Sequence, residues 1–243
     1  MIILNLNGIS INIYVKLIHI FMASKYIDIA VIVEPRKHNK LKLVVTNILE
    51  NLKDVKVQIF HGNLNKEFIL SELSEDIDNI ILTNLNKDNL TIREYSNMLL
   101  TKKFYDLIEG ERILLFQTDS CICNYNEEIL EECQQYGYVG APTKRYREIP
   151  WQNGGFSFRK KSLMIKAVNT IKKDEKIFPE DRFFSIDKQN ITNPAIFELA
   201  NRFSVESYYN ENPFGQHKCW NYQNDSNLKK LIEKFPIIEN LRN

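Results

Sequence analysis

The clearest candidate for chemistry is a single carboxylate that follows an apolar run. Residues 113–116 are all apolar, and residues 117–120 then read Gln-Thr-Asp-Ser. Such a run is typical of a strand buried on both faces, and ligands of open α/β sheets gather where those strands end. Asp119 could therefore bind a metal ion or a polar ligand. The alternative is an ordinary turn, because Thr, Asp and Ser all favour turns.

A second candidate lies near the C-terminus. The segment 212–220, NPFGQHKCW, places Gly215, His217, Lys218 and Trp220 within six residues and shows no periodicity. It predicts a loop that is mobile without a ligand and ordered around one. A lone His is more often structural, but a His-Lys pair in such a loop is less ordinary.

A third candidate is the segment WQNGG. Gly154 and Gly155 would let the backbone approach a ligand, and Trp151, Gln152 and Asn153 could offer an apolar face and hydrogen bonds to a polyol. A tight turn that enters the strand FSFR explains the same residues equally well.

An acidic pair follows in FPEDRFFS, residues 178–185. Pro179 suits the first turn of a helix, and Glu180 and Asp181 complement the dipole of its amino terminus. The dipole would favour an ionised Asp181. By itself this pattern predicts only a well-capped helix.

Alternating strand and helix patterns would position these residues. Thr91 and Glu94 resemble a capping box, and Asn193 with Pro194 is typical of a helix start. The order indicates βαβ units and a doubly wound α/β fold. The strands are expected at 27–34, 55–60, 77–85 and 112–117, and the helices at 39–52, 66–73 and 91–108. A further helix followed by a short strand is expected over 193–207.

The amino-terminal residues fit this pattern less well. The segment 9–22 is apolar, but Asn12, Lys16 and His19 interrupt it, and it is shorter than the ~20 residues of a spanning helix. Its alternation favours an extra strand. Met22 is an alternative start. We expect an extension or extra strand over 1–26 and one catalytic domain over 27–243.

Composition excludes several classes of function. Thirty-two basic and 31 acidic residues leave a net charge of +1, so the protein has no broad positive electrostatic field that would attract nucleic acid or an anionic membrane. The four cysteines lack zinc-site spacing and are few for a disulfide scaffold. Reduced thiols in a cytosolic-type compartment are the simplest interpretation.

Eight segments follow one another along the chain: VIVEPR, VQIFHG, LLFQTDS, YVGAP, NGGFSFRK, EDRFFS, FSVES and PFGQHKCW. In this order they resemble an uncharacterised glycosyltransferase-like family of giant viruses, microbes and some eukaryotes. The resemblance covers about 29–220 and implies a glycosyltransferase A fold with a mixed central sheet. It also implies a hexosyltransferase-like enzyme in the cytoplasm, or in the host cytoplasm or virion if the protein is viral.

The resemblance implies a nucleotide-sugar donor, with a UDP-sugar first, a glycan or protein acceptor, and a divalent metal. Typical relatives carry Asp-x-Asp after the fourth strand, where this chain has only Asp119. The closing loop is similar to one in which His binds the metal and Lys the diphosphate. The metal ligands would be Asp119 and His217. An imidazole ligand shifts the expectation from Mg²⁺ toward Mn²⁺.

The remaining roles also follow from the resemblance. An acidic pair at a helix start supplies the base of several inverting families, which implies that Asp181, beside Glu180, is catalytic. The nucleoside would lie near the end of the first strand. The expected donor-binding residues are Val33, Glu34, Arg36, Thr118, Asp119, Ser120, Asn153, Gly154, Gly155 and Lys218.

Two other functions stay open. A nucleotidyltransferase on a similar scaffold would form a nucleotide sugar, although its usual Gly-rich loop is missing from VEPRKHNK. A catalytically silent binding module would explain the missing second Asp.

Overall fold

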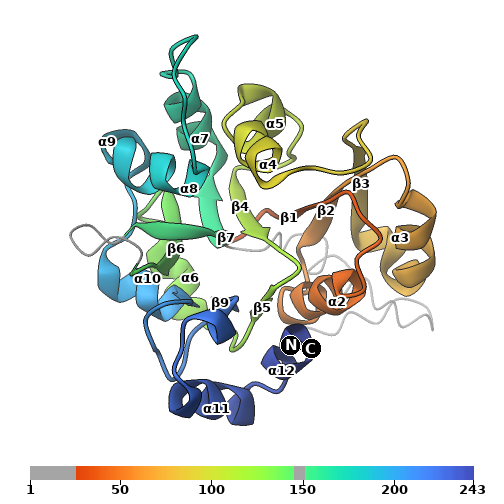
Figure 1. The fold of residues 1–243 in the computed structure, drawn as a ribbon, viewed down its shortest axis with the longest axis vertical. Helices are drawn as coiled ribbons and strands as arrows, with labels where there is room; N and C mark the ends of the chain where they lie inside the picture. Colours follow the sequence, from red (N-terminus) through yellow and green to blue (C-terminus); the bar gives the residue numbers. More distant parts are fainter. Residues whose placement is uncertain (1–25, 145–150) are drawn as a thin grey trace, which may run out of the picture.

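A six-stranded mixed sheet forms the centre of the protein (Figure 1). The computed structural model describes residues 26–144 and 151–243. The strand order is β3-β2-β1-β4-β7-β6; the first four strands are parallel, and β7 runs antiparallel to both β4 and β6. The strands are β1 (Ile29–Glu34), β2 (Lys56–His61), β3 (Ile80–Asn84), β4 (Arg112–Phe116), β6 (Tyr138–Pro142) and β7 (Gln152–Lys160).

The predicted strands correspond to β1, β2, β3 and β4, with ends that differ by up to three residues. The α/β fold class with a mixed central sheet is confirmed. The parallel strands could be recognised because helices cover both faces of the sheet, so that their side chains are apolar on both sides.

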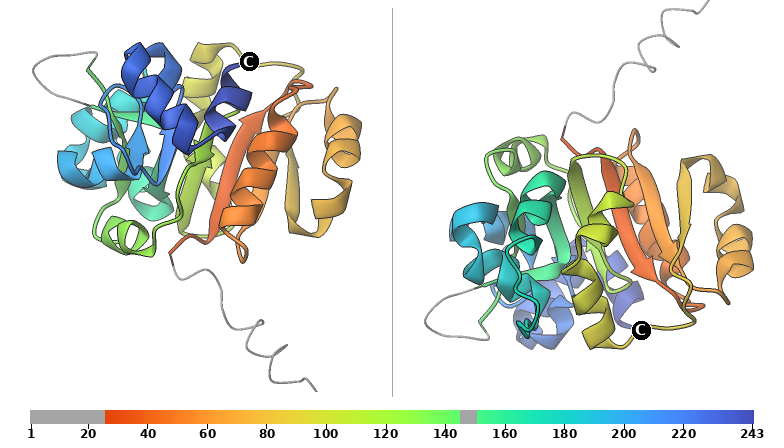
Figure 2. Two further views of the ribbon diagram at one scale, coloured as in Figure 1. Left: turned by 90° about the horizontal axis from the view of Figure 1, so that it is seen from below. Right: turned by 90° about the horizontal axis from the view of Figure 1, so that it is seen from above.

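Helices cover the two faces of this sheet, as the two side views in Figure 2 show. One core joins the sheet to α2, α3, α6, α10, α11 and α12, and the other joins it to α4, α5, α7 and the segment 183–187. The helices are α2 (Leu41–Asn51), α3 (Lys66–Glu72), α4 (Ile92–Leu99), α5 (Lys102–Asp106), α6 (Glu127–Cys133), α7 (Lys161–Val168), α8 (Glu180–Arg182), α9 (Gln189–Thr192), α10 (Phe197–Phe203), α11 (Asp225–Lys234) and α12 (Ile237–Arg242).

Successive residues of β1 enter opposite cores. Ala30 and Ile32 belong to the core on the α2 side, whereas Ile29 and Val31 belong to the core on the α5 side. This is the two-residue period of a strand, with both faces buried. Both cores hold β1 in place, and its carboxyl end is therefore a firm support for a site.

A second, three-stranded sheet has the order β5-β9-β8, with β5 (Ser120–Ile122), β9 (Gly215–His217) and β8 (Ser204–Val205). The prediction of a non-periodic loop over 212–220 was therefore wrong for its centre. The segment from Phe214 to His217 is buried and pairs with β5. Three residues are too few to show a strand period, so the sequence alone could not reveal β9.

Two helix boundaries also differ from the predictions. The capping box of Thr91 and Glu94 is confirmed, but the expected helix 91–108 divides into α4 and α5, and Thr101 caps the second. Asn193 does not begin a helix: it ends α9 in the left-handed conformation, with φ of 44°, and α10 starts at Phe197. Asn tolerates this conformation, so it can end a helix as well as begin one.

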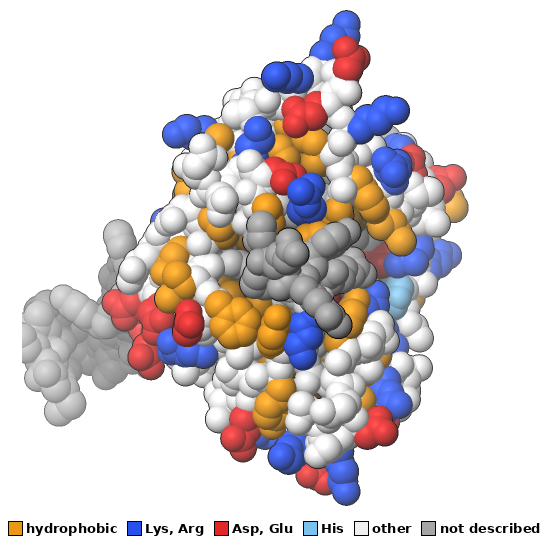
Figure 3. Space-filling view, turned by 60° about the vertical axis from the view of Figure 1, so that its left-hand side comes forward, with side chains coloured by type: hydrophobic (Ala, Val, Ile, Leu, Met, Phe, Trp, Pro, Cys, Tyr) orange, Lys and Arg blue, Asp and Glu red, His pale blue; other side chains and the backbone are white. Residues whose placement is uncertain are grey.

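The expected amino-terminal strand lies outside the described residues, and the division at 26/27 stays a prediction. Within the described residues, no helix is both long and apolar enough to cross a bilayer. Figure 3 shows basic and acidic side chains intermixed on one face, in keeping with the net charge of +1.

One buried amide links α2 to the second sheet. The side chain of Asn47 donates to the carbonyl oxygen of Ile122 at 3.1 Å and accepts from its N–H at 2.8 Å. We expect Asn47→Ala to lower the free energy of unfolding by about 2 kcal/mol, because it leaves two buried backbone groups without these partners. Urea denaturation measures this loss.

Asn51→Ala is the matched control on the same helix. Among the described residues, the side chain of Asn51 donates only to the carbonyl oxygen of Asn47, at 2.8 Å, and it is half-buried. Asn51→Ala should therefore lower the free energy of unfolding clearly less than Asn47→Ala does. Equal losses in the two variants would contradict the role given to Asn47.

Candidate functional site

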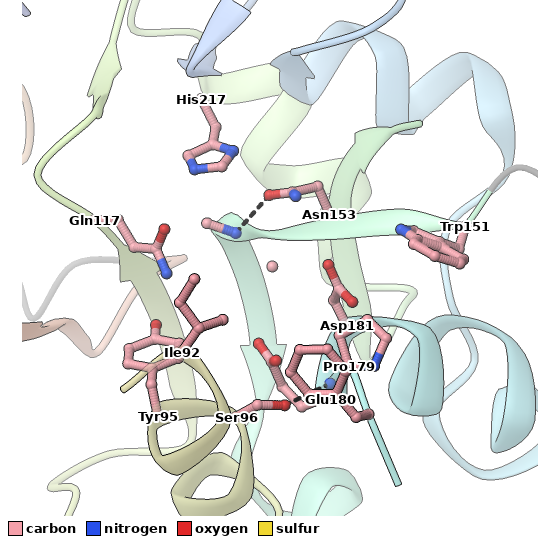
Figure 4. Close-up of a pocket in the computed structure, with 13 residues that line it drawn as sticks. Ile92, Tyr95, Ser96, Gln117, Trp151, Asn153, Pro179, Glu180, Asp181 and His217 are labelled. Carbon is pink, nitrogen blue, oxygen red and sulfur yellow. Dashed lines mark hydrogen bonds between the residues drawn. The ribbon is translucent and has the colours of Figure 1, made fainter. Parts of the chain in front are cut away.

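Two adjoining cavities open at the carboxyl ends of β1 and β4. The larger is about 620 Å³, the smaller about 330 Å³, and Ile92, Tyr95 and Gln117 line both. The smaller cavity is also lined by Val33, Glu34, Pro35, Arg36, Asn89, Leu90, Thr91, Thr118, Asp119 and Lys218. The larger is also lined by Ser96, Trp151, Asn153, Gly154, Gly155, Phe178, Pro179, Glu180, Asp181 and His217 (Figure 4).

The predicted residues thus divide between the two cavities. The expected nucleoside residues, Asp119 and Lys218 line the smaller one, and the acidic pair, His217 and four of the WQNGG residues line the larger one. Gln152 does not: its buried amide bonds the N–H of Gly140 and the carbonyl oxygen of Ala195, so it is not placed to bind a polyol. Ser120 is the other exception. It is fully buried, and its hydroxyl donates to the carbonyl oxygen of Gln117 at 2.8 Å and accepts its N–H at 3.0 Å. The turn interpretation is therefore the better one for Ser120.

Strand pairing brings the predicted metal ligands together. Ser120 of β5 lies opposite His217 of β9, and the N–H of Lys218 donates to the carbonyl oxygen of Asp119 at 3.0 Å. Asp119 Oδ1 is consequently 3.2 Å from His217 Nε2, and its Oδ2 is 2.9 Å from Lys218 Nζ. Lys218 has φ of 49°, a left-handed conformation that is uncommon for a residue with a side chain.

Glu206 is a site residue that sequence reasoning missed. It is buried, and its Oε1 is 3.2 Å from His217 Nδ1. A carboxylate on one ring nitrogen orients the imidazole and makes the other nitrogen a better ligand. Burial lowers the pKa of His217, but the hydrogen bonds to Asp119 and Glu206 outweigh this and raise it to about 9. The position of Glu206 directly after β8, in FSVES, was the available signal.

The pair of Asp119 and His217 suits a metal ion that substrate helps to bind. Asp119 Oδ1 and His217 Nε2 are both buried and face each other at 3.2 Å, with no other partner among the described residues. Across residues 26–144 and 151–243, no group of three or more metal-binding side chains occurs. A site of two protein ligands resembles those in which Mg²⁺ or Mn²⁺ is completed by water and substrate phosphates. The residues present fit such an ion.

The two glycines make room for this site. A Cβ atom on Gly155 would lie 2.3 Å from His217 Nε2, and one on Gly154 would lie 2.7 Å from a guanidinium nitrogen of Arg159. Asn153 Oδ1 accepts the N–H of Gly155 at 2.7 Å, as Figure 4 shows. Close approach is therefore what these glycines supply, as the sequence suggested, but to protein side chains.

Opposite these residues lie Glu180 and Asp181, both about 7% exposed. The N–H of Glu180 donates to Ser96 Oγ at 2.9 Å (Figure 4). Burial, followed by repulsion from Glu180, raises the pKa of Asp181 to about 7. The sequence analysis expected the helix dipole to favour the ionised form of Asp181, but the surroundings favour the protonated form. Helix α8 has only three residues, and desolvation exceeds any dipole effect.

Under this acidic pair lies Arg159, which the sequence analysis did not single out. Its side chain is 1% exposed, and a guanidinium nitrogen is 3.8 Å from Glu180 Oε1. The available signal was an Arg directly after Phe158 in the expected strand FSFR, because a buried charge needs a partner.

In the smaller cavity, Arg36 is already paired. Its Nε and one terminal nitrogen each lie 2.8 Å from an oxygen of Glu34, which is buried. Asn65 holds the loop by donating to the carbonyl oxygens of Glu34 and Arg36. Lys218 is less firmly held, because its side chain is 41% exposed beside Asp119.

The raised pKa of Asp181 predicts a pH effect on stability. Between about pH 4 and pH 7 the folded protein holds this proton more tightly than the unfolded chain does. The free energy of unfolding should therefore fall as pH rises, by up to about 1.4 kcal/mol per pH unit. We expect Asp181→Asn to remove this fall, as measured by urea denaturation across the range.

Two other groups titrate outside this window. Asp119 has a lowered pKa because His217 and Lys218 outweigh its burial, so its contribution is lost as pH falls below about 4. The contribution of His217 to the free energy of unfolding is complete below about pH 6.5 and is lost as pH rises through about 9.

The control for Asp181→Asn is Asp187→Asn, which changes an exposed acid six residues further along the chain. A wild-type slope in Asp181→Asn would contradict the assignment.

Comparison with known proteins agrees with this architecture. The apo-form glycosyltransferase GlyE of Streptococcus pneumoniae TIGR4 superposes with a TM-score of 0.50 at 10% identity, over 82% of this chain and 55% of that one. This chain thus spans about half the length of that glycosyltransferase. The 4-diphosphocytidyl-2C-methyl-D-erythritol synthase of Anaerococcus prevotii DSM 20548 gives a TM-score of 0.48 at 10% identity, over 88% of this chain and 98% of that one.

The likeness to GlyE shows the fold alone: this chain shares the mixed α/β fold of that glycosyltransferase. No curated protein matches the sequence. A family model described as protein of unknown function (DUF5672) matches residues 79–217, which hold Asp119, Asp181 and His217. The giant-virus assignment stays a prediction. Because the model matches more than half of the chain, this protein belongs to the family described as protein of unknown function (DUF5672).

Proposed function

We propose that this protein is a metal-dependent glycosyltransferase that moves a sugar from a nucleotide sugar to an acceptor hydroxyl with inversion. The observation that carries this proposal is the pair of adjoining cavities. One holds Asp119 and Lys218, and the other holds Asp181. A transfer reaction needs such an arrangement, because donor and acceptor must be held together with the leaving group on one side and a base on the other.

The smaller cavity suits the nucleoside diphosphate. Cleavage of the bond between the sugar and the diphosphate leaves an electron pair and negative charge on the diphosphate. Lys218 would bind that charge, and Asp119 with His217 would hold the divalent ion. When bound, the ion supplies further stabilisation of the leaving group. Because Arg36 is neutralised by Glu34, Lys218 is the better candidate for the phosphates.

The larger cavity suits the acceptor. Asp181 would take the proton of the acceptor hydroxyl while its oxygen forms the new bond to the sugar carbon. A base works best with a pKa near the operating pH, and the pKa of Asp181 is about 7. Its carboxylate lies beside Trp151 and Asn153, which could give a sugar an apolar contact and a hydrogen bond (Figure 4).

The metal role predicts a nucleotide-binding defect. We expect Asp119→Asn to lose most of the Mn²⁺ dependence of UDP affinity, because it removes the charged ligand oxygen. Calorimetry with UDP, with and without Mn²⁺, measures this. The control is Asp54→Asn, an exposed residue just before β2, at the opposite end of the sheet. Unchanged Mn²⁺ dependence in Asp119→Asn would remove it from a metal site.

The base role predicts a catalytic defect. We expect Asp181→Asn to keep UDP affinity but lose transfer by a factor on the order of 10² or more. A panel of nucleotide sugars with simple glycoside acceptors, read by NMR, gives both the rate and the anomeric configuration of the product. A retained configuration, or a near wild-type rate in the variant, would overturn the role of Asp181.

The same panel separates the other two functions. A nucleotidyltransferase would make a nucleotide sugar from a nucleoside triphosphate and a sugar phosphate, and a binding module would bind donor without turnover.

A further inference from the structure

Arg159 on β7 is a fully buried cation with an unusual set of partners. Its Nε donates to Ser157 Oγ at 2.9 Å, and a terminal nitrogen lies 3.4 Å from the hydroxyl of Tyr105. Its guanidinium carbon is 5.1 Å from the ring centre of Tyr138 and 5.5 Å from that of Phe184. These neighbours are neutral, so they hold the guanidinium in place without cancelling its charge.

The two carboxylates above Arg159 are held differently. Glu180 forms the ion pair, with its Oε1 3.8 Å from the guanidinium. Asp181 accepts a backbone N–H instead, that of Arg182, with its Oδ1 at 2.7 Å. Within 26–144 and 151–243, Glu180 is the one carboxylate in ion-pair contact with Arg159. The adjacent acids are therefore not equivalent.

Among the described residues, no second cation forms an ion pair with Glu180 or Asp181. Tyr95 and Tyr105 face the pair from α4 and α5, and Tyr138 faces it from β6; burial raises the pKa of each tyrosine, so all three stay neutral. The side chain of Arg182 turns to Asp187, at 3.2 Å. Arg159 is the charge that offsets the pair.

From this geometry we propose that Arg159 is a positioning residue that pairs with Glu180, so that Asp181, which lacks this ion pair, is the member of the pair that exchanges a proton. Glu180 then acts through its charge on Asp181 and does not itself touch the acceptor proton. The assignment of that proton to an acceptor hydroxyl rests on the proposed function, but the division of roles within the pair does not.

The division predicts shifts of opposite sign. Glu180→Gln removes a like charge next to Asp181 while Arg159 remains, so the titration midpoint of Asp181 should fall by at least one pH unit. Arg159→Met removes the cation, so the upper midpoint of the pair should rise by at least one unit. Arg159→Lys keeps the positive charge, so the upper titration midpoint of the acidic pair in this variant should stay closer to that of the wild type.

The measurement is carboxyl ¹³C NMR of protein labelled at Asp and Glu, across about pH 4 to 10, with Asp181→Asn to assign the signal. Arg112→Met is the control, because Arg112 also pairs with an acid, Asp28, but at the far end of β4. It should leave the midpoint unchanged. General loosening of the fold would move all the midpoints toward ordinary values, and not in opposite directions.

Unchanged midpoints, or shifts of the same sign in Glu180→Gln and Arg159→Met, would overturn the inference. If Arg159→Met does not fold, Glu180→Gln and Arg159→Lys still decide, because a midpoint that fails to fall in Glu180→Gln is sufficient to reject it. Where transfer is measurable, the acidic limb of the rate profile should follow the NMR midpoints. If the midpoints shift in opposite directions but no sugar transfer is found, the division of roles between Glu180 and Asp181 is supported and the proposed function is rejected.

Discussion

The antiparallel pairing of β5 with β9 is the constraint on which the site depends. It places Ser120 opposite His217 and so brings Asp119 to within 3.2 Å of an imidazole almost a hundred residues away in the chain. The amide of Asn47 fixes β5 from one side, and Glu206 fixes His217 from the other. A shift of one residue in this register would turn His217 to the opposite face of the small sheet and remove it from Asp119.

The site contains two aspartates whose pKa values are shifted in opposite directions. Asp181 is buried and Asp119 partly buried, yet the pKa of Asp119 is lowered and that of Asp181 is raised to about 7. The difference lies in their neighbours: His217 and Lys218 contact Asp119, whereas Asp181 lies beside a second acid. Pairs of acids with diverging proton affinities are typical of acid-base enzymes, and here each belongs to its own cavity.

Burial explains why several polar residues around the cavities are paired within the protein. Arg36 is bound by Glu34, and the hydroxyl of Ser120 is bound by Gln117. Such pairs hold the walls in shape and leave fewer groups free for a ligand. Lys218 keeps a partly exposed side chain, and among the described residues the facing atoms of Asp119 and His217 have no partner besides each other. These three are accordingly the side chains from which a ligand could gain most.

The sequence by itself determined the parallel strands and the position of Asp119 at the end of β4, because buried strands and their polar ends leave a local pattern in the chain. It also indicated the acidic pair and the His-Lys pair, whose residue types are uncommon in such surroundings. Only the tertiary structure decided that β9 is a strand, that Glu206 orients His217, and that Arg159 lies under Glu180. It also reversed the expected charge preference of Asp181. These features depend on contacts between distant segments and on desolvation, and neither leaves a periodic signal in the sequence.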